Sequence, residues 1–295
     1  LTIKIHLFMA RIKGVGYDGF QNEMKRLAGI KWQGYSRTLK EIGISYLGDV
    51  AQSAKLRHSL YHKVSTYGIY LASADLSNIN VCPYSDYCKA NCLNGSGHNR
   101  LDRMSRNGSI DKARIVKTRL FFANKEVFMR LMIHEIIRER EKAKKNGTFF
   151  SIRLNCTSDI NPIAFAIGGK NILDIFPDVQ FYDYTKVPNR INVAQKYNNY
   201  DITWSIDGSR KNREIGLAFL KKGGRVAVVY GEDDMPKTWY GYECGNGDET
   251  DYRPGDIAPV CALKFKKTAH NYVNGKFRLP NIAFIVTRKN KNVIW

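Results

Sequence analysis

From about residue 66 onward, short runs of apolar and β-branched residues alternate with longer stretches whose apolar positions recur at the helical period. The short runs predict strands at residues 66–73, 149–155, 179–184, 201–206, 225–230, 258–265 and 282–286. The longer stretches predict helices at residues 111–122, 124–145, 162–167, 188–196 and 212–221. Regular alternation of strands and helices predicts a parallel sheet with right-handed crossovers.

The stretch at residues 124–145 has the most complete set of helix signals in the chain. Asn124 stands where an N-cap is needed, and an apolar stripe begins at Phe128. Lys142, Lys144 and Lys145 fall in the last turn, where the helix dipole favours cations. Gly147 follows and predicts the end of the helix.

About six strand–helix units predict an α/β fold, a closed or partial (β/α) barrel of about six parallel strands. A doubly wound open sheet is the alternative. Residues 1–60 are basic and lack the alternation, so we expect an N-terminal extension there and the barrel-like domain at residues 61–295.

The chain has 47 Lys and Arg against 27 Asp and Glu, a formal charge of +20, which predicts a polyanionic partner, either nucleic acid or a nucleotide. In the N-terminal extension Trp32, Tyr35 and Tyr46 are interleaved with basic residues, a pattern that suits base stacking and phosphate contact as well as ordinary packing. No apolar run reaches membrane-spanning length, so no membrane partner is expected. Six cysteines without a secretory signal favour a reducing compartment, the cytoplasm.

Three of the cysteines lie close together, Cys82, Cys88 and Cys92, with the spacing C-x5-C-x3-C directly after the first predicted strand. Thiolates this close can share one metal centre, and iron–sulfur clusters and zinc are the usual occupants. Three thiolates predict a [4Fe-4S] cluster with one iron left open. A zinc site is one alternative, and it normally needs a fourth protein ligand. The candidates for that ligand are His98, Cys156, Cys244 and Cys261. Three thiols that bind no metal are the other alternative.

Polar residues follow successive predicted strands, and in parallel sheets the ends of the strands meet at one edge. The candidate cofactor-binding residues there are Asn155, Ser158, Asp159, Asp183, Lys186 and Ser205. Each has an ordinary structural interpretation as a helix cap, a turn residue or a solvated side chain. The long acidic stretch at residues 231–256 predicts a lid or binding loop, and its carboxylates match no metal-binding motif.

Between about residues 60 and 265 the chain resembles a bacteriophage protein family, the "gene eighty-eight" proteins. The matching stretches are residues 67–72, 80–83, 92–94, 96–97, 113–122, 153–160, 176–186 and 226–229. The resemblance implies a phage origin, and therefore the host cytoplasm, but no activity.

More distantly, a three-cysteine loop after the first strand of a (β/α) barrel looks like the radical-SAM arrangement, although that class has the spacing C-x3-C-x2-C. This likeness implies that the open iron binds S-adenosylmethionine and that a radical acts on nucleic acid or a nucleotide. The alternative is a non-catalytic iron–sulfur or zinc protein that binds nucleic acid. Whether the chain is an enzyme stays open at this point.

Overall fold

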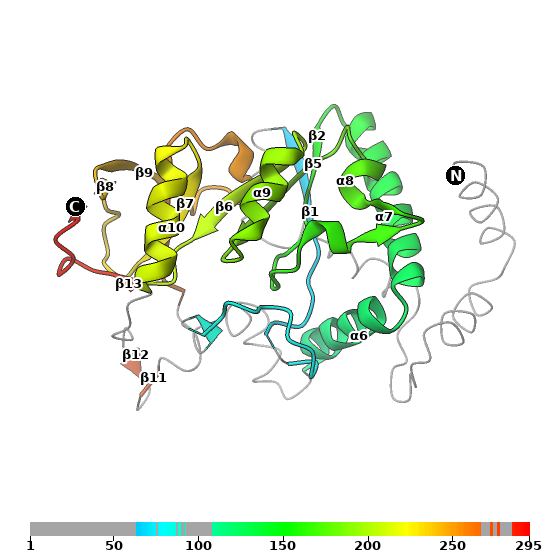
Figure 1. Ribbon diagram of the computed structural model, residues 1–295, viewed down its shortest axis with the longest axis horizontal. Coiled ribbons are helices and arrows are strands. Elements are labelled where there is room, and N and C mark those ends of the chain that lie inside the picture. Colours follow the sequence, from blue (N-terminus) through cyan, green and yellow to red (C-terminus); the bar gives the residue numbers. More distant parts are fainter. Residues whose placement is uncertain are drawn as a thin grey trace, which may run out of the picture.

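The computed structural model describes residues 63–74, 76–86, 88–89, 92, 108–266, 272–273, 276–277 and 285–295. The predicted N-terminal extension, its aromatic residues and His98 lie outside these residues. Within them the chain builds one large sheet with helices packed against it (Figure 1).

Four helices match the sequence prediction closely: α6 (Ser109–Ala123), α7 (Lys125–Lys145), α9 (Asn189–Lys196) and α10 (Arg210–Lys221). The short helix α8 (Ile172–Ile175) was not predicted. The Asn124 side chain accepts a hydrogen bond from the backbone N–H of Val127, which confirms the predicted N-cap of α7. The expected helix at residues 162–167 is wrong. Only a 3-10 turn, η5 (Pro162–Ala164), forms there, because the chain turns at once into a small hairpin of β3 (Ala166–Ile167) and β4 (Lys170–Asn171).

The central strands of the sheet are parallel and follow one another in chain order: β1 (Val64–Gly68), β2 (Phe149–Arg153), β5 (Gln180–Thr185), β6 (Tyr200–Ser205), β7 (Arg225–Tyr230) and β10 (Val260–Lys264). Beyond β10 the sheet continues through β9 (Tyr242–Asn246), β8 (Thr238–Trp239) and β14 (Val293–Ile294). β13 (Ile285–Val286) pairs with the end of β7, and β11 (Tyr272–Val273) with β12 (Lys276–Phe277) forms a separate hairpin.

The predicted barrel is wrong. A barrel would need the last parallel strand to pair with the first, but the free side of β10 is taken by β9, and β1 pairs only with β2 among the described strands. The sheet is therefore open, as in the alternative prediction. Its strand order does not reverse as it does in a doubly wound sheet, and the likeness to the radical-SAM barrel gains no support from the fold.

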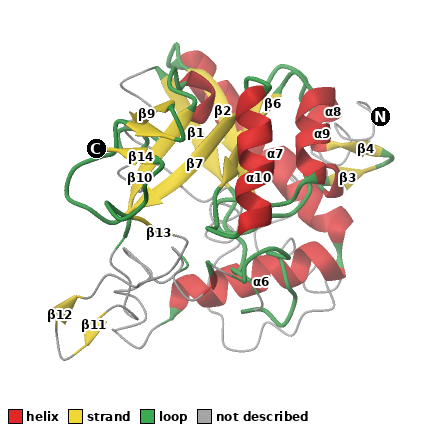
Figure 2. Ribbon diagram, turned by 60° about the vertical axis from the view of Figure 1, so that its left-hand side comes forward, coloured by secondary structure: helices red, strands yellow, loops and turns green. Residues whose placement is uncertain are grey.

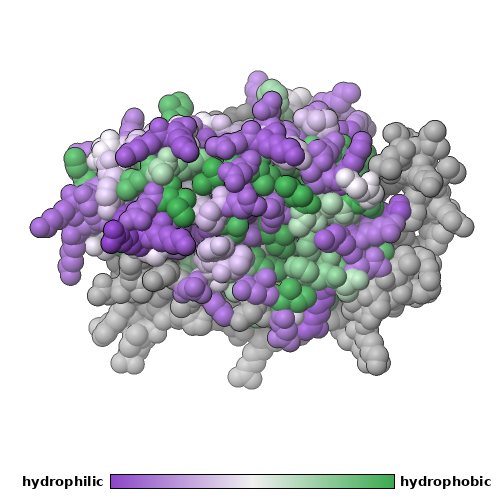
Figure 3. Space-filling view, viewed as in Figure 1, coloured by the Kyte–Doolittle hydropathy of each residue, from purple (hydrophilic) through white to green (hydrophobic). Residues whose placement is uncertain are grey.

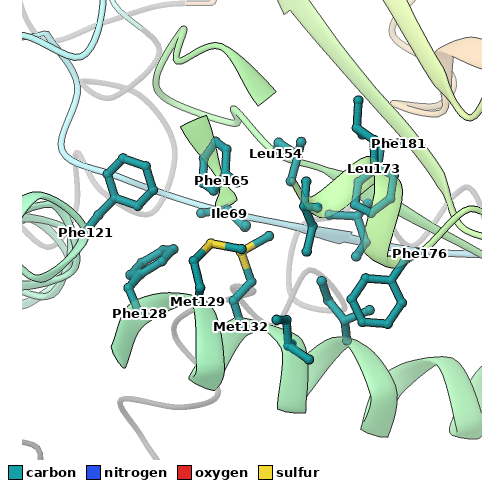
Figure 4. Close-up of a cluster of buried hydrophobic side chains, with 14 of the residues drawn as sticks. Ile69, Phe121, Phe128, Met129, Met132, Leu154, Phe165, Leu173, Phe176 and Phe181 are labelled. Atoms are coloured by element: carbon teal, nitrogen blue, oxygen red, sulfur yellow. The ribbon is translucent and has the colours of Figure 1, made fainter. Parts of the chain in front are cut away.

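The two faces of the sheet differ in composition. Figures 1 and 2 show α7, α8, α9 and α10 on one face, which we call the helix face, with α6 apart from them. On the helix face, Ile152, Leu154 and Phe181 pack with Phe128 and Met132 of α7 in the main hydrophobic core (Figure 4). Because side chains alternate along a strand, their neighbours point to the other side.

We call that other side the polar face. It carries Thr66, Ser151, Arg153, Tyr182, Tyr184, Asp201, Thr203, Ser205 and Arg225. Residues 250–256, which include the 3-10 turn η6 (Arg253–Gly255), lie against this face. The ring of Tyr252 packs edge-on to that of Tyr182, and Asp251 pairs with Arg153. We call residues 250–256 the covering segment.

The outer surface of the helices is hydrophilic over most of the area visible in Figure 3, with hydrophobic residues between the helices. Among the described residues, no helix combines the length and the apolar character needed to cross a lipid bilayer.

Candidate functional site

The cysteine loop, residues 81–92, begins beside the turn that follows β2, where Val81 and Cys82 contact Asp159 and Thr157. The backbone N–H of Asp159 donates to the carbonyl of Val81 over 2.8 Å, and the hydroxyl of Thr157 donates to the carbonyl of Leu71 over 2.6 Å. The thiol of Cys82 lies 3.8 Å from the carbonyl oxygen of Thr157. These contacts place the first cysteine at the edge where the parallel strands end, which we call the carboxyl edge.

The three cysteines of the loop are neighbours at this edge. Burial raises the pKa of the Cys82 thiol to about 12, and Asp159, Cys92 and Cys88 add to the effect through their charges. Burial likewise raises the pKa of Cys88, opposed by Lys186 and reinforced by Cys92. All three side chains are half-buried. The structure thus brings the predicted metal ligands to the ends of β5 and β6.

As placed, the thiols do not form a ligand shell. Among the described residues, no group of three or more His, Cys, Asp or Glu side chains is arranged so that it could hold a metal ion. Burial raises the pKa of the Cys82 and Cys88 thiols, which favours their protonated form, and the Cys82 thiol is directed at a carbonyl group.

Most of the candidate cofactor-binding residues are occupied by contacts with one another. The amide of Asn155 donates to Asp183 over 2.8 Å and its oxygen accepts from Ser158 over 2.8 Å and from the backbone of Ile160 over 2.8 Å. Asp159 accepts from the hydroxyl of Thr185 and from the backbone N–H of Lys186, each over 2.8 Å. These bonds fix the shape of the turn after β2. The polar atoms that make them are therefore not available to bind a ligand.

Arg190 of α9 closes this network. Its guanidinium donates to Asp159, to Asp183 and to the hydroxyl of Tyr200, and its side chain is fully buried. Burial opposes its charge, but Tyr200, Asp183 and Asp159 together raise the pKa of Arg190, so it remains a cation. Sequence reasoning missed Arg190 and Tyr200, because neither follows a strand; the only signal is an arginine in the first turn of a short helix.

Lys186 and Ser205 are the predicted site residues that stay nearest to the cysteines. The ammonium of Lys186 donates to the hydroxyl of Ser205 over 2.9 Å, and its charge acts on Cys88. Both residues belong to the polar-face side of the edge. Lys186 therefore places a positive charge beside the thiol of Cys88.

A fourth cysteine lies deeper, between the polar face and α6. Cys156 is surrounded by Tyr70, Arg153 and Lys117, and burial raises the pKa of its thiol to about 12. The guanidinium carbon of Arg114 also lies over the ring of Tyr70, 5.2 Å from the ring centroid. Arg114 is influenced by both Cys156 and Cys92, so Cys156 lies near the cysteine loop although on the far side of the turn.

The acidic stretch at residues 231–256 pairs with basic residues of the fold. Asp251 binds Arg153, Asp256 binds Arg253, Asp233 binds Lys264, Asp248 binds Lys266, and Asp234 binds Arg288. These carboxylates therefore neutralise neighbouring cations, and a divalent ion is not needed to account for them.

The polar face contains the second group of residues that sequence reasoning missed. Arg153 donates to Asp251, Tyr182 donates to the same carboxylate over 3.3 Å, and the guanidinium carbon of Arg153 lies 4.5 Å from the ring centroid of Tyr184. The sequence signal for this group is the spacing of Tyr182 and Tyr184, since residues two apart on a strand lie on the same face of the sheet.

The comparison with protein families agrees with the resemblance seen in the sequence. The model of the gene product 88 family matches residues 46–275, and the chain belongs to this bacteriophage family. The chain matches no curated protein and no solved structure.

Proposed function

Starting from its membership of the gene product 88 family, we propose that this protein carries a thiolate-bound metal centre and binds nucleic acid. The centre is an iron–sulfur cluster on Cys82, Cys88 and Cys92, and the binding is non-catalytic. The observation that carries the proposal is the gathering of three half-buried thiols at the carboxyl edge, where Cys88 and Cys92 both act on the pKa of Cys82 and Cys92 also acts on the pKa of Cys88.

The donor set fits the group chemically. Three cysteine thiolates are soft ligands of the kind that iron–sulfur clusters use, and no fourth protein ligand is needed when one iron is left to another ligand. Metal binding requires the thiols to lose their protons and to turn toward one another, since no ready-made shell exists among the described residues. Rotation of the half-buried side chains about χ1 supplies this movement. A zinc centre is the alternative occupant.

The charge of the chain supports the nucleic-acid part of the proposal. The +20 formal charge is accompanied by exposed lysines on the helix layer, at the ends of α7 and α10 and on α9. These are Lys142, Lys144, Lys145, Lys196, Lys211, Lys221 and Lys222. A phage protein of this kind would act in the host cytoplasm.

The enzymatic hypothesis, with S-adenosylmethionine bound at the open iron, remains a second possibility without a structural observation in its favour. The residues expected to position the cofactor, Asn155, Ser158 and Asp159, already use their polar atoms within the fold. We therefore retain the binding function as the proposal.

The metal centre is tested by purifying the protein without oxygen and measuring iron, sulfide and zinc per chain together with the absorption spectrum. We expect a brown protein with iron and sulfide, and loss of both in a variant with Cys82→Ser and Cys88→Ser. Cys244→Ala is the matched control, because Cys244 lies in the second core cluster on β9 and should keep the cluster. Colourless wild-type protein with zinc favours the alternative, and protein without any metal under these conditions overturns the proposal.

Nucleic-acid binding is tested separately by fluorescence anisotropy with a labelled DNA duplex and a single strand at increasing salt. We expect affinity that falls steeply with salt. A variant with Lys221→Glu and Lys222→Glu should bind more weakly than wild type, with Lys170→Glu as a control for a single exposed charge on β4. No binding to either nucleic acid at low salt would remove this part of the proposal.

A further inference from the structure

The polar face contains two buried polar atoms that have no hydrogen-bond partner within the part of the chain that the structure describes. They are Nε of Arg153 and the hydroxyl oxygen of Tyr184. Both come from neighbouring strands, and the guanidinium of Arg153 lies over the ring of Tyr184 with its carbon 4.5 Å from the ring centroid. Buried polar groups are normally paired, so two unpaired ones side by side require an explanation.

The guanidinium of Arg153 uses only part of its donor set. Nη1 donates to both carboxylate oxygens of Asp251, over 3.0 and 2.8 Å. Neither Nε nor Nη2 donates to any described residue. These two nitrogens form one edge of the planar group, with two parallel N–H bonds directed away from it. That edge is the part of an arginine that binds the two oxygens of a carboxylate or phosphate.

The surroundings match such a ligand. The hydroxyl of Tyr184 can donate a further hydrogen bond to an oxygen atom. Lys186 comes directly after the end of β5, and its ammonium donates to the hydroxyl of Ser205 on the polar face, so its charge lies on the same side of the sheet. The side chain of Arg153 remains 14% exposed although its Nε is buried, so a ligand would approach from the side of Nη2, which is not among the buried unpaired atoms.

We propose that the polar face holds an oxyanion-binding site, in which the Nε–Nη2 edge of Arg153 and the hydroxyl of Tyr184 bind a phosphate or carboxylate group of a small ligand. Lys186 provides a second positive charge at the side of the site toward the cysteine loop. Asp251 holds the guanidinium in position from its opposite side. The site is separate from the thiolate centre and does not depend on it.

The site is tested by isothermal titration calorimetry of the full chain with two probes, inorganic phosphate and acetate. We expect saturable binding of at least one of them, and the preferred probe tells whether the natural ligand is a phosphoryl compound or a carboxylate. Tyr184→Phe removes one hydroxyl and nothing else, and should weaken binding about tenfold, as expected for a hydrogen bond to a charged group. Arg153→Lys keeps the positive charge but removes the two parallel N–H donors of the Nε–Nη2 edge, and should abolish measurable binding.

Tyr182→Phe is the matched control. Tyr182 lies two residues before Tyr184 on the same strand and face, but its hydroxyl already donates to Asp251. Its loss should change the affinity for the probe by no more than about twofold, within the range of an indirect effect. Circular dichroism of each variant establishes that it is folded.

Two results would overturn the proposal. One is the absence of saturable binding of both probes to the wild-type protein. The other is equal affinity in wild type and Tyr184→Phe, which would mean that the bound probe makes no hydrogen bond to the Tyr184 hydroxyl and that the proposed site is not where it binds. Loss of the metal in the cysteine variants should leave phosphate or acetate binding unchanged, so failure of the oxyanion site and failure of the metal centre are told apart.

Discussion

Two arginines near the carboxyl edge, one on each side of the sheet, show how differently the same side chain can be used. Arg190, on the helix face, directs its donors to Asp159, Asp183 and Tyr200 and is fully buried. Arg153, on the polar face, uses one nitrogen for Asp251 and leaves Nε and Nη2 without described partners. Both are held by carboxylates, yet only one has donors left.

The difference separates an arginine that stabilises the fold from one that has donors available for a ligand. A cation whose donors are all matched by the fold has nothing left to offer a ligand, and its removal leaves buried carboxylates uncompensated. A cation that is anchored on one side and unmatched on the other is already oriented for a ligand. The sequence prediction was based on position at the end of a strand. That position does not show whether the donors of a side chain are already paired within the fold.

The largest effect on stability should come from replacing Arg190, whose donors are all paired within the fold. Arg190→Met removes the only described cation that contacts the fully buried carboxylate of Asp183, and we expect the free energy of unfolding to fall by about 3–5 kcal/mol. Urea denaturation followed by circular dichroism measures this loss. Arg130→Met is the control, because Arg130 forms an exposed pair with Glu126 within α7 and should cost less than about 1 kcal/mol. Equal losses in the two variants would contradict the structural role of Arg190.

A third buried cation, Lys117 of α6, extends the comparison to pH. Burial lowers the pKa of Lys117 to about 7 in the folded protein, from its ordinary value of 10.5. Between about pH 7 and pH 10.5 the unfolded chain holds a proton on this lysine that the folded chain has released, so the free energy of unfolding should rise with pH by up to about 1.4 kcal/mol per pH unit. Below pH 7 both states are protonated and this gain is absent.

Lys117→Met should remove this part of the slope and should be more stable than wild type at pH 6. Urea denaturation of both proteins at several pH values between 6 and 10 compares the slopes. Identical slopes would mean that the amine of Lys117 keeps its ordinary pKa.

Loss of the Asp251 charge, which holds Arg153 in position, should lower the stability of the protein but raise its affinity for the oxyanion. Asp251→Asn removes the charge that Arg153 pairs with, and we expect a loss of about 1–3 kcal/mol in the free energy of unfolding. The same change removes the negative charge nearest to the proposed oxyanion, so phosphate or acetate should bind more tightly if the substituted protein is folded. Asp178→Asn, which affects an exposed pair with Arg140, should change neither quantity appreciably. Weaker oxyanion binding in Asp251→Asn would indicate that orientation by Asp251 outweighs its charge.

The smallest expected effect lies in two hydroxyl groups on β5. Tyr182→Phe removes a buried hydrogen bond to Asp251 and should lower the free energy of unfolding by about 1 kcal/mol. Tyr184→Phe removes a buried hydroxyl that has no described partner, so without ligand its stability should be unchanged or higher. Thermal unfolding in a buffer free of phosphate and carboxylate shows whether each variant is less or more stable than wild type. A loss in Tyr184→Phe equal to that in Tyr182→Phe would show that its hydroxyl is bonded in the folded protein.

The sequence predicted the local elements well where periodicity and caps agree. The helix at residues 124–145 and the strand at residues 225–230 coincide with α7 and β7 to within a residue. Short elements such as α8, β8 and β9 were missed, because two to five residues give no reliable period. The barrel was wrong because alternation of strands and helices specifies parallel neighbours but not whether the last strand returns to the first; here β9 takes that place beside β10.

The candidate site was predicted in part. The cysteines and the strand-end residues meet at one edge, as expected for parallel strands. What the sequence could not tell is which polar atoms the fold itself would use. Asp159 and Asp183 pair with Arg190, a residue of a different element, and Asn155 donates to Asp183. Saturation of hydrogen bonds is a property of the assembled structure, and no spacing in the sequence reveals it.

The central claim, a metal centre held by Cys82, Cys88 and Cys92, is tested most directly by X-ray absorption at the metal edge of protein purified without oxygen. The account predicts an iron spectrum with a first shell of sulfur and a second shell of neighbouring iron, lost together when Cys82 and Cys88 are replaced by serine. A first shell of oxygen and nitrogen alone, or a sulfur shell that survives these replacements, would contradict it.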